Sequence, residues 1–96
     1  MLDQEITEFL IKTANNVAMA ESRYSKAKYE LELQKAGHIL ENDWEKLLGK
    51  KKPTVLEKEA FILRDTEEEQ REVMDLKVQR DYCRRIFEIS MLQNSV

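Results

Sequence analysis

The residues best suited to nucleophilic catalysis are the one histidine, His38, and the one cysteine, Cys83. Such a pair works only when the two side chains lie within hydrogen-bonding distance. An antiparallel helical hairpin would place Cys83 near the start of the first helix, away from His38. Cys83 also falls on an apolar stripe between Leu76 and Phe87, where a free cysteine acts as a small hydrophobic residue. We therefore predict no catalytic site, no cofactor and no enzymatic activity.

A second cluster that could bind a metal ion is the acidic run at residues 67–69, three glutamates that follow Asp65 closely. Calcium and magnesium need oxygen ligands that converge on the ion, usually from a loop. Consecutive helical residues point about 100° apart, so three adjacent glutamates cannot converge. We predict a solvated helix face and no metal site. An antiparallel register could pair this run with the basic residues Arg23, Lys26 and Lys28.

The best candidate for a nucleic-acid contact is a lysine-rich segment with a neighbouring tryptophan: Trp44, Lys46, Lys50, Lys51 and Lys52. Lysines can neutralise phosphates, and an indole ring can stack on a base. The alternative is that the lysines form an ordinary solvated loop and that Trp44 packs back on the hairpin. We favour this alternative.

The composition favours one all-α domain over residues 1–96. Two glycines and one proline leave little material for the turns of a β fold, and 36% charged with 42% hydrophobic residues is typical of long, partly exposed helices. The net charge of −3 predicts no general attraction to nucleic acid or to an anionic membrane. One cysteine, no long apolar run and acidic residues near the N-terminus predict a cytoplasmic protein without a membrane span.

Hydrophobic spacing predicts a first helix over residues 3–36, which ends before Gly37. Steps of three and four residues place one stripe on this helix: Leu10, Thr13, Val17, Ala20, Tyr24, Ala27, Leu31 and Gln34. Several of these residues are small or polar, which favours a close helix neighbour over a thick core. The pattern therefore indicates one arm of a helical hairpin.

The connection over residues 37–53 is predicted to contain a short helix at 43–48, capped by Asn42 and ended by Gly49. Thr54 and Glu57 then have the spacing of a capping box, which predicts a second long helix over residues 54–92. The expected fold is a long antiparallel helical hairpin.

The last turns of the second helix are apolar on two flanks. One flank carries Val73, Leu76, Cys83 and Phe87, and the other carries Val78, Tyr82, Ile86 and Ile89. A hairpin buries only one flank, so we expect coiled-coil-like assembly into a helical-bundle homo-oligomer. The candidate interface with another copy or a partner comprises Tyr82, Ile86, Phe87, Ile89, Met91 and Leu92.

Two segments carry a family resemblance. Residues 38–54 read HILENDWEKLLGKKKPT, and residues 77–88 read KVQRDYCRRIFE. These resemble small helical proteins of temperate phages and prophages of low-GC Gram-positive bacteria, which share an ILxxDWExxLGKxxPT-like core before a long charged helix. The resemblance implies a role near phage replication and recombination functions. It carries over no catalytic residue, because none is established for that family.

The expected function is therefore that of a non-enzymatic phage or prophage accessory protein. It would act by protein–protein interaction, with a phage or host protein of DNA replication or recombination as its partner. One alternative is a nucleic-acid-binding accessory protein that uses the lysine-rich linker. Another is a structural or assembly spacer.

Overall fold

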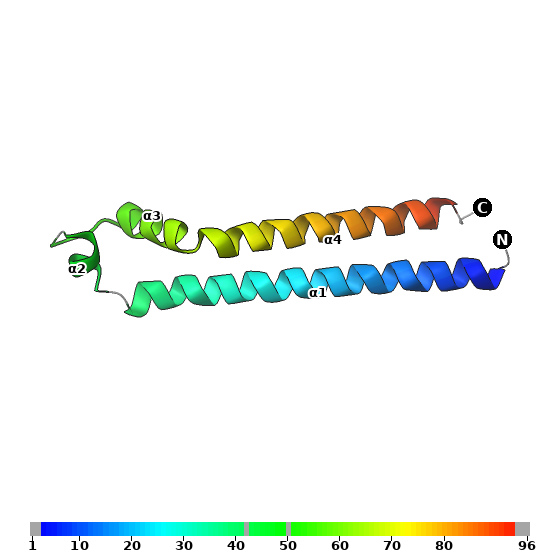
Figure 1. Cartoon of the computed structure of the whole chain (residues 1–96), viewed down its shortest axis with the longest axis horizontal. Helices are drawn as coiled ribbons and strands as arrows, with labels where there is room; N and C mark the ends of the chain where they lie inside the picture. Colours follow the sequence, from blue (N-terminus) through cyan, green and yellow to red (C-terminus); the bar gives the residue numbers. More distant parts are fainter. Residues whose placement is uncertain (1–2, 42, 50, 94–96) are drawn as a thin grey trace.

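Two long helical arms lie antiparallel along a narrow rod, with both ends of the chain at one end of it (Figure 1). The computed structural model describes residues 3–41, 43–49 and 51–93. Its helices are α1 (Asp3–Glu41), α2 (Trp44–Leu48), α3 (Val55–Asp65) and α4 (Glu67–Gln93). The rod measures 70 × 17 × 16 Å. The predicted all-α helical hairpin is confirmed, and none of the described residues forms a strand.

A continuous stripe on each arm faces the other arm, and we call these two stripes the seam. On α1 the seam follows the predicted positions from Leu10 to Leu31, all buried or half-buried. Gln34 is exposed, and Lys35 and His38 continue the stripe instead. This shift follows from the helical period of 3.6 residues, which drifts away from a strict seven-residue repeat. On the second arm the seam begins at Thr66, between α3 and α4, and continues on α4 with Glu69, Val73, Leu76, Arg80, Cys83, Phe87 and Ser90.

Three cross-helix contacts at different heights define the register of the hairpin. Arg84 Nε donates to Glu21 Oε1 at 2.7 Å, and the Arg80 guanidinium lies 4.3 Å from the centre of the Tyr24 ring. Nearer the turn, His38 Nε2 lies 2.8 Å from Asp65 Oδ2. Residues 20–24 of α1 therefore face residues 80–84 of α4.

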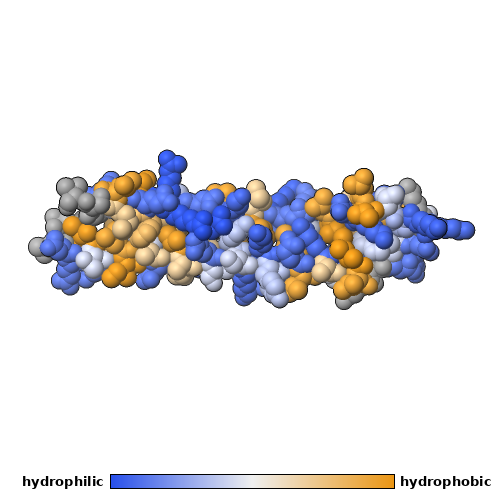
Figure 2. All heavy atoms as spheres, turned by 180° about the vertical axis from the view of Figure 1, so that it is seen from behind, coloured by the Kyte–Doolittle hydropathy of each residue, from blue (hydrophilic) through white to orange (hydrophobic). Residues whose placement is uncertain are grey.

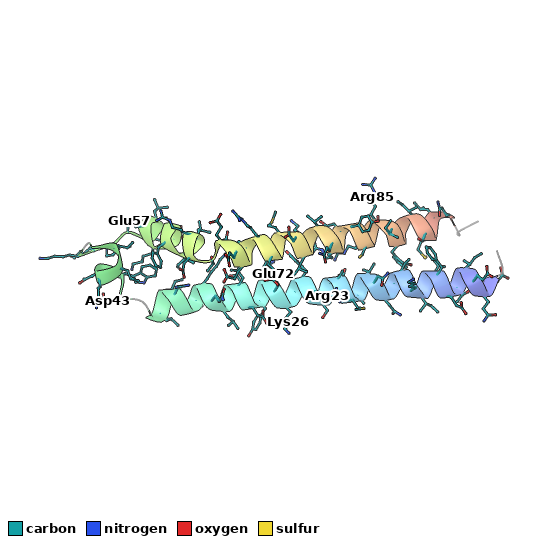
Figure 3. The ribbon with its side chains drawn as sticks, in the orientation of Figure 1. Arg23, Lys26, Asp43, Glu57, Glu72 and Arg85 are labelled. Carbon is teal, nitrogen blue, oxygen red and sulfur yellow. The ribbon has the colours of Figure 1, made fainter. Side chains whose placement is uncertain are left out.

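The register does not produce the pairing of the acidic run with Arg23, Lys26 and Lys28 that we considered possible. Glu69 lines a groove with Gln34 and His38, far along the rod from Lys26. Lys26 instead points away from α4 (Figure 3).

The hairpin buries little apolar surface. In the part of the chain that the structure describes, the buried hydrophobic residues are Leu31, Trp44 and Ile62. The chain exposes 7872 Å², whereas a compact protein of its 11.4 kDa mass would expose about 5,800 Å². Its radius of gyration is 20.8 Å, against about 12.5 Å for a compact domain of this length. Most of the rod therefore lies close to solvent.

The first helix extends past Gly37, where we predicted its end, and reaches Glu41. Glycine within a helix costs only about 1 kcal/mol relative to alanine. Contacts beyond the glycine offset this cost, because His38 pairs with Asp65 and lies edge-on to Phe61. Tertiary contacts therefore override the local stop signal.

The caps of the shorter helices agree partly with the sequence. Asp43 caps α2 by accepting from the Lys46 amide at 3.3 Å, while the predicted cap, Asn42, lies outside the described residues. Gly49 ends α2 with a left-handed φ of 68°, a conformation that glycine adopts without strain. Thr54 caps α3 as predicted, and its hydroxyl oxygen accepts from the Glu57 amide at 3.2 Å.

The predicted continuous helix over residues 54–92 is wrong, because it breaks at Thr66 between α3 and α4. The buried Thr66 hydroxyl donates to the Ile62 carbonyl at 2.7 Å. The side-chain Nε2 of Gln70 donates to the Thr66 hydroxyl at 2.9 Å and to the Leu63 carbonyl at 3.0 Å. These bonds compete with the regular helical pattern, so the chain bends without proline or glycine.

The described residues include no helix with both the length and the hydrophobicity needed to cross a membrane.

The small core at the turn end makes Ile62 a sensitive position. Ile62 is 5% exposed and its neighbour Leu63 is 51% exposed. We expect Ile62→Ala to lower the free energy of unfolding by about 2–5 kcal/mol and Leu63→Ala by less than about 1 kcal/mol. Urea unfolding followed by circular dichroism, at one protein concentration, measures both. Equal losses would contradict the assignment of Ile62 to the core.

Candidate functional site

Trp44 lies in the core of the turn rather than on its surface. Its side chain is 8% exposed and packs edge-to-face on Phe61, with ring centres 5.5 Å apart. The indole nitrogen donates to the Ile39 carbonyl at 3.4 Å, and the Lys58 ammonium lies 5.9 Å from the ring centre. Stacking on a base would require Trp44 to leave these contacts. The structure therefore matches the alternative in which Trp44 packs back on the hairpin.

The lysines near the turn share their surface with acidic residues. Lys46, Lys51 and Lys52 are exposed, while Lys50 lies outside the described residues. A shallow depression places Lys46 and Lys51 beside Asp43 and Glu45. The carboxylates weaken the positive potential that phosphate binding needs.

His38 and Cys83 are far apart. His38 contacts Asp65 near the turn, whereas Cys83 is half-buried in the seam beside the pair formed by Glu21 and Arg84. Their heights along the rod differ by about 25 Å at 1.5 Å per helical residue. A cysteine nucleophile with a histidine base is therefore not assembled here.

The pair of His38 and Asp65 is a contact that sequence reasoning missed. It lines a groove at the break between α3 and α4, together with Leu33, Gly37 and Thr66. A histidine–carboxylate pair can act as a base for an adjacent nucleophile. The Thr66 hydroxyl lines the same groove, but its hydrogen is donated to the Ile62 carbonyl. Among the described residues, no group of three or more histidine, cysteine or acidic side chains is placed to hold a metal ion.

The strongest candidate site is the outer surface of α4 near its C-terminus. Val78 is 65% exposed, Tyr82 66% and Leu92 73%, so large apolar side chains face solvent. Ile89 and Met91 are also exposed and Ile86 is half-buried. Figure 2 shows apolar residues gathered towards both ends of the rod, with a largely hydrophilic middle. Such a surface is suited to contacts with another protein.

The candidate interface residues divide between two surfaces. Phe87 occupies a seam position and is half-buried on the side of α4 that faces α1. The other candidates lie outside the seam. Arg85 lies among them and points away from α1 (Figure 3). The second flank identified in the sequence is therefore left uncovered by the hairpin.

The packing of Trp44 predicts a specific spectroscopic response. The chain contains one tryptophan, so its fluorescence reports the turn alone. Phe61→Ala removes the ring that packs on the indole, and we expect the emission to shift to longer wavelength as water reaches Trp44. Leu56→Ala is the control, because Leu56 is 76% exposed. Quenching of the wild-type emission by single-stranded DNA at low salt would instead show that Trp44 is available to bases.

Comparison with known proteins assigns the chain to no family. No protein-family model matches the sequence. Searches of the curated proteins and of the solved structures also gave no match. Its own surfaces, together with the sequence resemblance described above, are therefore the basis for a functional proposal.

Proposed function

We propose that this chain is a non-enzymatic interaction protein, built from helical hairpins that assemble into a bundle. The observation that carries the proposal is the two-sided apolar character of α4. One side bears Leu76, Cys83 and Phe87 and packs on α1. Another bears Val78 and Tyr82, which remain about two-thirds exposed.

Covering this flank would release substantial free energy. Full burial of a valine or leucine side chain contributes about 1.5–3 kcal/mol. The flank offers several such residues on a rigid helix, so little conformational entropy would be lost on binding. The hairpin core is small by comparison, which makes an assembled state more favourable than an isolated hairpin.

The resemblance to small phage and prophage proteins supports a biological setting for this binding. We propose that the partner is a phage or host protein of DNA replication or recombination. A helix laid in an apolar groove is the recognition mode that a flank of this kind supports.

The elongated shape supports a second function, that of a structural or assembly spacer. A rod of 70 × 17 × 16 Å could hold two partners apart. Direct nucleic-acid binding through the lysine-rich linker has less support, because Trp44 is buried and acidic residues lie beside the lysines.

Affinity purification from the phage-infected bacterial host tests the adaptor function. We expect the tagged wild-type chain to retain a replication or recombination protein after nuclease treatment. Val78→Glu should abolish this capture, because it places a charge on the exposed flank. Val55→Glu is the matched control, since Val55 is 69% and Val78 65% exposed. Loss of the partner on nuclease treatment would favour nucleic-acid binding, and equal capture by both variants would remove the flank from the interface.

A further inference from the structure

Each arm of the hairpin has an outer edge, which is the side that points away from the other arm. Lys26 on α1 and Arg85 on α4 mark these two edges (Figure 3). Residues three, four or seven positions away lie near the same edge, because that spacing returns a helix to the same face. The outer edges are therefore the surfaces that the seam cannot cover.

The outer edge of α1 is apolar near the turn. Tyr29, Leu33, Ala36 and Leu40 follow one another at steps of four, three and four residues and form one stripe. Tyr29 is 65% exposed, Leu33 53% and Leu40 84%. The α4 flank proposed above as an interface does not include these residues. α1 therefore carries an unpartnered apolar stripe of its own.

The outer edge of α4 is apolar near the open end instead. Tyr82, Ile89 and Leu92 are exposed there, with Arg85 between them. This stripe is roughly 15 Å long and the α1 stripe roughly 17 Å, at 1.5 Å per residue. The two stripes lie on opposite edges and at different heights along the rod, so they cannot meet within one chain.

We propose that the α4 stripe docks on the α1 stripe of a second copy of this chain. The two rods lie side by side and point in the same direction, with the second shifted along the rod by about 27 Å. This shift follows from the register, in which Glu21 lies beside Arg84. That register leaves Ile89 about 18 residues along the rod from Leu33.

The shift brings the apolar residues of the two stripes together. The facing pairs are Tyr82 with the partner's Leu40, Ile89 with the partner's Leu33, and Leu92 with the partner's Tyr29. Arg85 faces the partner's Ala36, the smallest residue of the α1 stripe, so the long arginine side chain has room to reach solvent. Docked in this way, α4 and α1 of the partner subunit are antiparallel, as the two arms of one hairpin are.

The same shift matches regions of opposite charge. Residues 43–52 at the turn include four lysines and two acidic residues, whereas residues 67–75 at the start of α4 include five acidic residues and one arginine. The 70 Å rod extends roughly 12 Å beyond a helix of 39 residues, and the turn occupies this length. After the shift, Asp75 lies about 9 Å beyond the end of the partner subunit's α1, at the height of its turn. A second copy therefore satisfies an apolar and a charged contact at once.

The docking leaves an open row of copies. Each copy offers its α4 stripe to one neighbour and receives another on its α1 stripe, so the contact does not close on itself. Each contact covers a short length of helix, so the assembly is weak and depends on concentration. One α4 stripe stays uncovered at the end of a row, where a different protein partner would bind. This inference rests on the proposed assembly and specifies its geometry.

Sedimentation equilibrium of the full chain over about 1–300 µM tests the docking. We expect the average mass to rise past twice the 11.4 kDa chain mass as the concentration increases. Leu33→Glu and Tyr82→Glu should each lower the association constant by about ten-fold or more, because each buries an unpaired carboxylate. Circular dichroism of each variant checks that the hairpin is still helical.

Met19→Glu is the matched control for Leu33→Glu. Met19 and Leu33 are both 53% exposed and lie on the same outer edge of α1. Met19 lies beyond the end of the partner subunit's α4 after the shift, so its substitution should change the association constant by less than about three-fold. Equal effects of Met19→Glu and Leu33→Glu would overturn the proposed shift.

The charged contact has its own test. Raising the salt concentration from about 0.05 M to about 0.5 M should weaken the assembly several-fold, because salt screens exposed charges. Assembly that does not weaken with salt would overturn the facing of the α4 start and the partner subunit's turn.

Mixing the two blocked variants tests the head-to-tail geometry directly. Tyr82→Glu blocks the α4 stripe but leaves the α1 stripe intact, and Leu33→Glu does the reverse. Each variant alone should stay monomeric at concentrations where the wild-type chain assembles. An equimolar mixture should form a species of twice the chain mass and nothing larger, because one intact stripe of each kind remains. A mixture that stays monomeric would overturn the docking of α4 on α1.

The remaining outcomes separate this inference from the proposed function. A wild-type chain that stays monomeric across the whole range would overturn both the docking and the proposed bundle, whereas capture of a different protein by the α4 flank is measured independently. A wild-type mass that levels off at twice the chain mass would overturn the open row and leave assembly standing. Loss of assembly in Leu33→Glu but not in Tyr82→Glu would show that α1 docks on α1 of the partner subunit, and would overturn the inference.

Discussion

Two helices that touch along one line can each bury only one stripe of side chains, and this geometry constrains the whole hairpin. α1 and α4 meet along the seam, and the described residues of these two helices outside it remain near solvent. The chain nevertheless carries large hydrophobic residues beyond the seam, among them Met19 and Tyr82. In a compact domain further layers would cover them. In this hairpin only another protein chain can cover them. The narrow rod is therefore suited to binding another protein.

The seam is itself unusually polar. Thr66, Arg80 and Ser90 occupy positions of the second arm where a coiled coil usually places leucine or isoleucine. The Arg80 side chain is 17% exposed, stacks on Tyr24 and pairs with Asp81. Contacts of this kind add little stability, but they distinguish the observed register from a shifted one. If the arms slid by one helical turn, Arg80 would face Ala20 or Ala27 instead of Tyr24. The seam therefore sets the alignment of the arms more than it stabilises them.

The apolar core is concentrated at the turn. Trp44 and Phe61 pack on each other, and Ile62 is buried beside the break in the second arm. At the open end the most buried positions are Thr13 and Ser90, which contribute little hydrophobic stabilisation. The exposed apolar flank of α4 lies towards the open end, where the isolated hairpin is least well packed. Packing of the turn and the proposed assembly through this flank would then be complementary sources of stability.

Local patterns in the sequence determined the helices, the antiparallel arrangement, the Thr54 cap and the two apolar flanks of α4. These features depend on side-chain spacing and short-range hydrogen bonds, which a sequence displays directly. Tertiary structure alone decided the extension of α1 beyond Gly37 and the packing of Trp44 against Phe61. It also brought His38 to Asp65 and decided which of the two flanks of α4 faces α1. Each of these depends on which residues meet across the hairpin, and the register of two arms is a long-range property that no local pattern specifies.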